Sequence, residues 1–265
     1  MRAIDLNADL GEYQDGAQQQ MEREILGCVS SCNIACGGHT GDELTMRETL
    51  KSAREAGVRC GAHPSYPDRE GFGRRALGIQ PDALHVSLIQ QVRDLLAIAR
   101  DLDVSLAHVK PHGALYNHIA DDLDLARLVV GVVKDTSSAN GRPLALVGLA
   151  DSAAKQAAEE AGLAFVGEAF VDRRYTAGGR LQPRDQSGAV IKDDHDRLTQ
   201  ALAIAAGKPV TTCDGNTITL NAQTLCLHGD SPGALATARA VRQALSEQGF
   251  TICPPNADLQ DGMRD

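Results

Sequence analysis

The segment HVKPHGALYN, residues 108–117, decides the fold because it joins a strand to a helix through a polar turn. It follows a short β-branched run and precedes a helical stretch, and Pro111 and Gly113 break both kinds of element. The turn carries an ammonium, two imidazoles and a phenol. Titratable groups crowded on such a turn are costly for folding and useful for chemistry. The segment therefore predicts an α/β scaffold with a site at the end of a strand.

The same arrangement of polar residues at the end of an apolar run recurs along the chain. The expected strands span residues 3–8, 31–36, 59–62, 105–109, 144–148, 164–166 and 224–227, and helical patterns alternate with them. No Pro/Gly/Ser-rich linker divides the chain, so the alternation favours a single TIM-like β/α barrel of about seven or eight strands. We expect residues 1–254 to form this one domain and residues 255–265 to form a frayed C-terminal tail.

Local signals mark individual elements. A helical apolar repeat follows Pro81, which suits a first-turn position, and Asp121 and Asp151 are expected to cap two further helices. Residues 168–189 are rich in Arg, Gly and Asp without a helical period, which predicts a long functional loop. Residues 209–220 predict a small hairpin.

Composition bounds the class of protein. The 265 residues are 43% hydrophobic, enough to bury a large core, but only 3% aromatic with no Trp, so no stacking platform for single-stranded nucleic acid is expected. The net charge of −9 argues against a phosphate-backbone partner. No stretch is apolar enough to span a bilayer, and no signal peptide is recognised at the N-terminus, so we expect a cytoplasmic protein. Its seven cysteines are then expected to be reduced.

In a barrel, the polar residues at the strand ends would come together and form a site. Strand residues alternate faces, so Asp5, Asn7 and Asp9 should point to one side. The C-terminal ends of all strands converge at the barrel mouth, which should make neighbours of His39, His63, Lys110, His112 and His228. The structural alternatives are a solvated edge or a buried hydrogen-bond network for Asp5 and Asn7, and for Lys110 an ion pair with a carboxylate such as Asp5.

Two other patterns favour ordinary roles. Cys28, Cys32 and Cys36 are spaced by four, but no CxxC pair occurs, and buried free thiols are the better interpretation. No Walker loop or GxGxxG motif is present. The turn at residues 37–42 could present N–H groups to an anion, or be a tight turn in which Asp42 caps the next helix; both could hold together.

Five segments in order resemble the LamB/YcsF family: DLNADLGE (5–12), NIACGGH (33–39), GAHPSYPD (61–68), HVKPHG (108–113) and CLHGD (226–230). The likeness runs from about Ile4 to Pro254. It implies a distorted or seven-stranded barrel of the glycoside hydrolase/deacetylase superfamily type. It also implies hydrolysis of 5-oxo-L-proline to L-glutamate, with ATP consumed by a complex of this chain and two partner subunits, B and C. Gly178 stands where the resemblance leads us to expect an acidic residue, so no role is assigned there.

The implied chemistry suggests roles for the polar residues. A five-membered lactam is a resonance-stabilised amide, and phosphorylating its oxygen would couple ring opening by water to ATP. This needs a general base, cations and oxyanion donors. The hypothesised catalytic roles are Asp9 as base with Asp42 as second choice, Lys110 facing phosphate or oxyanion charge, and His112 as proton shuttle. Arg74 or Arg184 would clamp the substrate carboxylate. Further substrate-binding candidates are Asn7, His39, His63, Tyr116, His228 and Asp230.

Two other functions stay open. A metal-dependent deacetylase or other amide hydrolase would find suitable ligand types in Asp5, Asp9, His39, His63 and His112, although no short-range pair such as HExxH is present. The third interpretation is a non-catalytic subunit that binds a lactam or a sugar. The excess of titratable groups at the mouth speaks against it, because a neutral-ligand site needs few.

Overall fold

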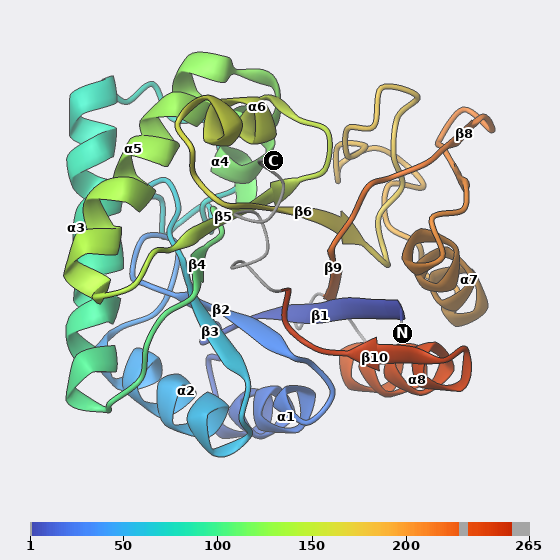
Figure 1. The fold of residues 1–265 in the computed structure, drawn as a ribbon, viewed down its shortest axis with the longest axis horizontal. Coiled ribbons are helices and arrows are strands. Elements are labelled where there is room, and N and C mark those ends of the chain that lie inside the picture. The colour runs from blue at the N-terminus through green and yellow to red at the C-terminus, as the bar shows by residue number, and fades with distance from the viewer. Residues whose placement is uncertain (1, 228–232, 256–265) are drawn as a thin grey trace, which may run out of the picture.

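The computed structural model describes residues 2–227 and 233–255, and a closed parallel barrel forms its centre (Figure 1). The ring consists, in order, of β1 (Arg2–Leu10), β2 (Ser31–Ala35), β3 (Arg59–His63), β4 (His108–Val109), β5 (Ala145–Leu149), β6 (Phe165–Phe170) and β9 (Thr224–Leu227). β1 pairs with β9 to close it. The predicted seven-stranded α/β barrel is confirmed, although β4 is shorter than the expected run of residues 105–109.

Helices surround the strands (Figure 1). In the described residues they are α1 (Gly16–Leu26), α2 (Glu43–Glu55), α3 (Pro81–Asp101), α4 (Gly113–Asp121), α5 (Leu123–Asn140), α6 (Ala153–Glu160), α7 (Asp194–Ala205) and α8 (Ala234–Glu247). Their buried apolar faces and the strands share one continuous hydrophobic core. In α3, Pro81 occupies the first turn as predicted, and Leu88, Val92 and Leu95 are fully buried.

The pairing of β1 changes along its length. Residues 2–4 pair with β10 (Phe250–Ile252), whereas residues 5–8 pair with β9. The ring therefore closes only from Asp5 onward, and the last strand of the described chain extends the sheet beside the start of the first. The predicted hairpin is confirmed as β7 (Val210–Thr211) and β8 (Thr217–Ile218).

The long segment after β6 is ordered by its own contacts. β6 continues to Phe170, so the loop predicted from residue 168 begins three residues later. Isolated bridges join Arg173 to Val190 and Tyr175 to Leu181. The buried Arg173 guanidinium donates to two backbone carbonyls of the same loop, those of residues 182 and 189. The loop is thus a packed structure beside the barrel mouth.

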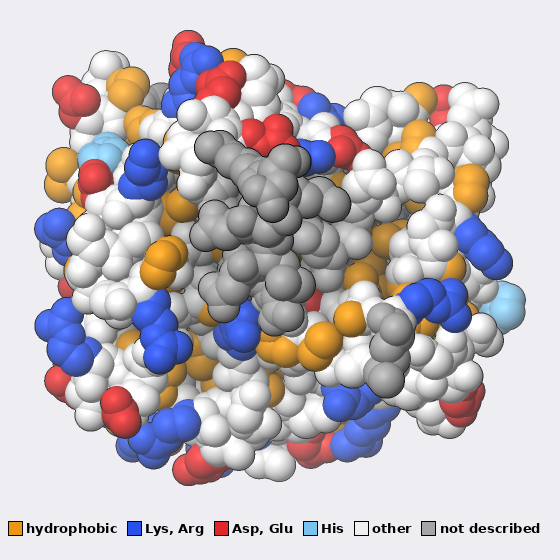
Figure 2. Space-filling model, in the orientation of Figure 1, with side chains coloured by type: hydrophobic (Ala, Val, Ile, Leu, Met, Phe, Trp, Pro, Cys, Tyr) orange, Lys and Arg blue, Asp and Glu red, His pale blue; other side chains and the backbone are white. Residues whose placement is uncertain are grey.

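The distribution of surface charge and the state of the cysteines agree with what the composition predicted. Acidic and basic side chains are interspersed over the described part of the face in Figure 2. All seven cysteines are free, and Cys28, Cys32 and Cys36 are buried as predicted. Among the described helices, none combines the length and the apolar character needed to cross a membrane.

Candidate active site

The interior of the barrel is polar along β1 because alternate residues of this strand face inward. Asp5 lies at the base, where its carboxylate accepts hydrogen bonds from the hydroxyls of Ser30 (2.6 Å), Ser31 (2.9 Å) and Thr224 (2.6 Å). Burial raises the pKa of Asp5. This residue belongs to a buried hydrogen-bond network, one of the alternatives left open for it, and lies away from the mouth.

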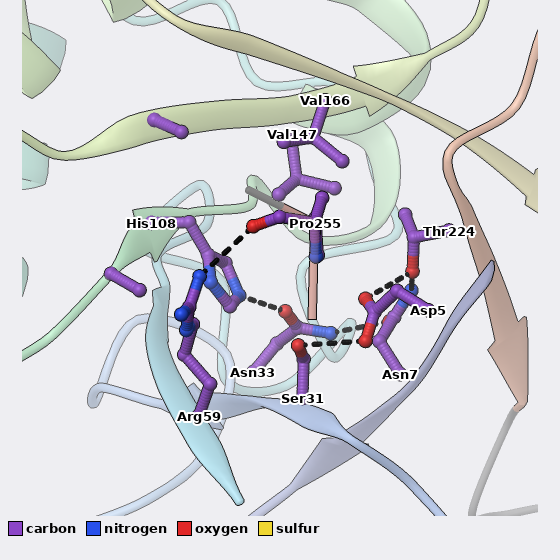
Figure 3. Close-up of a pocket in the computed structure, with 12 residues that line it drawn as sticks. Asp5, Asn7, Ser31, Asn33, Arg59, His108, Val147, Val166, Thr224 and Pro255 are labelled. Atoms are coloured by element: carbon purple, nitrogen blue, oxygen red, sulfur yellow. Dashed lines mark hydrogen bonds between the residues drawn. The ribbon is translucent and has the colours of Figure 1, made fainter. Parts of the chain in front are cut away.

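The network continues upward through amides (Figure 3). Asn33 Nδ2 donates to Asn7 Oδ1 and to Asp9 Oδ1, each at 2.8 Å, and His108 Nε2 donates to Asn33 Oδ1 at 2.7 Å. Burial lowers the pKa of His108 to about 3, so its ring is neutral at pH 7. Beside these groups lies a cavity of about 20 Å³, room for one water, with valines of β5 and β6 on its opposite wall. The base of the barrel is therefore structural support for the mouth.

Lys110, at the end of β4, is the centre of the mouth. Its side chain is 2% exposed, and Nζ lies 2.8 Å from Asp9 Oδ1, 2.9 Å from Glu168 Oε1, 3.3 Å from Asn7 Oδ1 and 3.2 Å from Cys226 Sγ. Burial opposes the charge, but the neighbours, Asp9 foremost, outweigh it and raise the pKa of Lys110 well above its usual value. The ammonium is thus charged at pH 7. The structural alternative of an ion pair between Lys110 and a carboxylate is confirmed, but the carboxylates are Asp9 and Glu168 and not the suggested Asp5.

Sequence reasoning missed Glu168 because it assigned this residue to the long loop. β6 in fact runs through it, and strand alternation turns Val166 and Glu168 toward the barrel interior. The carboxyl of Glu168 is fully buried. Together with burial, the larger cause, Glu168 raises the pKa of the neighbouring Tyr116 phenol. The alternation of large and small residues in FVGEAF (165–170) was the available signal.

Three histidines meet beside Lys110, one at the end of β3 and the others in the connections that follow β2 and β4. The ring of His39 stacks on that of His112 with centroids 3.7 Å apart, and His63 stands edge-on to His112 at 4.9 Å. Glu12 Oε1 lies 2.9 Å from His39 Nε2 and 3.7 Å from His112 Nδ1. Burial lowers the pKa values of His39 and His112 well below the usual value, so both rings are neutral at pH 7. One ligand atom from each of the four residues lies within 4.8 Å of the others, a grouping that could hold a metal ion.

Sequence reasoning also missed Glu12, which follows the end of β1. The backbone N–H groups of Gly11 and Glu12 donate to the carboxyl of Glu22 on α1, at 2.7 Å and 3.1 Å. Gly11 adopts φ of 77°, a conformation that favours glycine. Burial raises the pKa of Glu22 to about 7. A buried carboxyl on a neighbouring helix therefore holds the turn that aims Glu12 at the histidines.

An open pocket of about 700 Å³ lies above these groups. Asp9, Glu12, His63, Lys110 and His112 line its inner part, and the predicted Arg74, Tyr116 and Arg184 line it as well. Arg74 and Arg184 are exposed, whereas Tyr116 is buried. Its volume is that of a small-molecule site, and charged side chains make up a large share of its lining.

Other predicted residues lie elsewhere. Asn7 is beneath Lys110, where its Nδ2 donates to Glu168 Oε1 and Thr224 Oγ1. Asp42 is exposed and caps α2, accepting a hydrogen bond from Thr45 N at 2.9 Å, as the structural alternative proposed. It is not among the residues that line the mouth pocket. His228 and Asp230 lie outside the described residues.

The chain is similar to proteins of known name over nearly its whole length. It is 48% identical over 255 residues to a protein of Chloroflexus aggregans named as the A subunit of 5-oxoprolinase, and the match covers 96% of this chain and 100% of that one. The protein of the same name from Bordetella pertussis is 45% identical over 250 residues, covering 94% and 98%.

A solved structure supports the same relationship. The crystal structure of the lactam utilization protein from Thermus thermophilus superposes with a TM-score of 0.85 at 37% identity, covering 95% of this chain and 99% of that one. The model of the LamB/YcsF family matches residues 4–260. With the barrel, the mouth and these relatives in agreement, the chain belongs to the LamB/YcsF family.

Proposed function

We propose that this chain is the lactam-opening component of an ATP-dependent 5-oxoprolinase, acting on 5-oxo-L-proline to release L-glutamate together with two partner subunits, B and C. The observation that carries this is the buried Lys110 ammonium between Asp9 and Glu168 at the floor of an open pocket. Relatives of nearly equal length, whose names assign them to this enzyme, support the choice of substrate.

Each role follows from position. Asp9 lines the pocket and is the general base that deprotonates water, with its Oδ1 anchored by Lys110 and Asn33. Lys110 supplies fixed positive charge beneath the reacting carbonyl, which stabilises oxyanion or phosphate charge in a site shielded from water. Arg74 and Arg184 approach from the exposed part of the pocket and bind the substrate carboxylate.

Partner subunits are needed because the sequence carries no phosphate-binding loop of the Walker or GxGxxG kind. The test is reconstitution from separately purified proteins. We expect glutamate release from 5-oxo-L-proline only when this chain, both partners and ATP are present. Full ATP-dependent activity from this chain alone would contradict the division of labour. Calorimetric binding of 5-oxoproline with no turnover in the complex would instead identify a protein that only binds the lactam.

A second candidate function is metal-dependent hydrolysis of an amide without ATP. The grouping of Glu12 with three buried histidines favours it, because these are zinc-type ligands beside a carboxylate that can act as base. One assay of chelator-treated chain without partners separates the two functions. Hydrolysis of acetylated sugars or other amides that zinc restores without ATP would favour this second function.

A further inference from the structure

Two histidines of the mouth face each other through one ring nitrogen each. His63 Nδ1 lies 2.7 Å from the carbonyl oxygen of Lys110, and His112 Nε2 lies 3.0 Å from that of Phe72. A carbonyl oxygen only accepts, so each of these two nitrogens donates a proton to it. The remaining nitrogens, His63 Nε2 and His112 Nδ1, are only 3.0 Å apart. Two lone pairs at this distance would repel each other, so a cation between them, a shared proton or a metal ion, stabilises the pair.

The spacing of the surrounding ligand atoms suits a metal ion. Zinc bonds of about 2.0–2.2 Å place two tetrahedral ligands about 3.3 Å apart. The separation of the two ring nitrogens is 3.0 Å, and Glu12 Oε1 lies 3.7 Å from His112 Nδ1. These values lie on either side of the ideal separation, and all the ligand atoms of the grouping lie within 4.8 Å of one another.

The groups behind these atoms hold them in place. Hydrogen bonds from the far ring nitrogen to a backbone carbonyl fix the tautomer of a ligating histidine, and both His63 and His112 make one. His39 donates from Nε2 to Glu12 Oε1, and its ring lies flat on His112. Asp9 Oδ2 lies 3.4 Å from His63 Nε2 and adds negative charge that a cation offsets.

We propose that His63, His112 and Glu12 bind one divalent transition-metal ion, for which zinc is the best match, and that His39 positions Glu12. Two neutral imidazoles and one carboxylate are the ligand types that zinc takes in sites with an open position. All three ligands line the mouth pocket, so that open position faces the pocket. This assigns His112 to metal binding in place of the proton shuttle, and it leaves Asp5 and Asp9 out of the ligand set.

The proposal concerns binding, and it stands whichever amide the protein opens. Its test uses the full chain without a histidine tag, stripped with a chelator and titrated with zinc against a chromophoric competitor. We expect one equivalent to bind. Glu12→Gln and His112→Asn should each weaken binding at least about a hundredfold. His118→Gln is the matched control, because His118 lines the same pocket outside the grouping and should bind zinc like the wild type.

Cobalt(II) gives a readout independent of activity. The wild-type chain should show the visible absorption of a four- or five-coordinate ion, and Glu12→Gln, whose fold is checked by its thermal transition, should lose it. A wild-type chain that retains no zinc, or Glu12→Gln with unchanged affinity, would overturn the proposal. So would nitrogen NMR showing one proton shared by His63 and His112 in the presence of zinc. Glutamate release by the complex is measured separately, so absence of zinc binding would leave the proposed lactam hydrolysis standing.

Discussion

At the residue scale, the mouth depends on a lysine with more acceptors around it than it has protons. Lys110 Nζ lies within 3.3 Å of four acceptor atoms, two of them from buried or nearly buried carboxylates. Replacing it with Met, which has a similar length, removes the cation that these carboxylates share. We expect Lys110→Met to lower the free energy of unfolding by about 3–5 kcal/mol, besides removing activity. Denaturant unfolding measures this, and an unchanged unfolding free energy would show that the ion pairs contribute little.

The choice of general base is tested by two matched substitutions. Asp9→Asn keeps the shape and can still accept from Lys110, so the protein should stay folded while turnover by the complex falls at least about a hundredfold. Asp42→Asn keeps the cap of α2, because Asn caps helices as well as Asp. Its turnover should be near normal. A large loss of turnover in Asp42→Asn, together with normal turnover in Asp9→Asn, would identify Asp42 as the general base instead of Asp9.

Buried neutral histidines make the fold sensitive to acid. His108 has a pKa of about 3 when folded, against about 6.5 in an unfolded chain. Below pH 6.5 the unfolded state takes up a proton that the folded state refuses, so the free energy of unfolding falls as pH drops from 6.5 toward 3. His108 alone contributes a slope of up to about 1.4 kcal/mol per pH unit. Unfolding curves of His108→Asn at pH 7 and pH 5 should show a smaller loss than the wild type; equal losses would contradict this account.

At the scale of elements, local signals located the strands and helices but not all of their ends. Asp122 caps α5 through its side chain, and Ser152 occupies the N-cap position of α6, each one residue beyond the expected Asp121 and Asp151. Asp121 and Asp122 offer the same capping group, and Asp151 and Ser152 are both good capping residues, so local chemistry cannot choose within either pair. Likewise β6 reaches Phe170 through pairing with β9, a contact between distant segments that overrides weak strand formers such as Gly and Glu.

The junction of β3 and β4 offers a packing test. A Cβ at Gly61 would clash with the His108 ring at Nε2, so the histidine needs the bare glycine. We expect Gly61→Ala to destabilise the protein by about 1–3 kcal/mol. Adding His108→Ala should recover part of this loss, because the two changes meet at one contact. Gly178→Ala is the control, because a Cβ there would make only an ordinary contact, 3.8 Å from Thr176 Oγ1, and Gly178 has no positive φ. If the effects of the two substitutions on the free energy of unfolding were strictly additive, the close approach of Gly61 and His108 would not be the cause of the destabilisation.

At the scale of the whole molecule, the convergence of strand ends explains why the site was largely predictable. Once a barrel was expected, His63, Lys110 and His112 had to lie near one another, and they do. Glu12 was not predictable in the same way. Its direction depends on a turn held by Glu22, and no rule of spacing along the chain contains that contact. The alternation of strands and helices in the sequence thus predicted which residues gather at the mouth. Hydrogen bonds between distant elements decide which of their atoms face each other.

The central claim is that this chain opens a lactam at the expense of ATP in a three-subunit complex. The most direct measurement counts glutamate and phosphate released from 5-oxo-L-proline by the reconstituted complex. We predict equal amounts of both products, and no glutamate when this chain or ATP is omitted. Glutamate that forms without ATP, or at the same rate without this chain, would contradict the account.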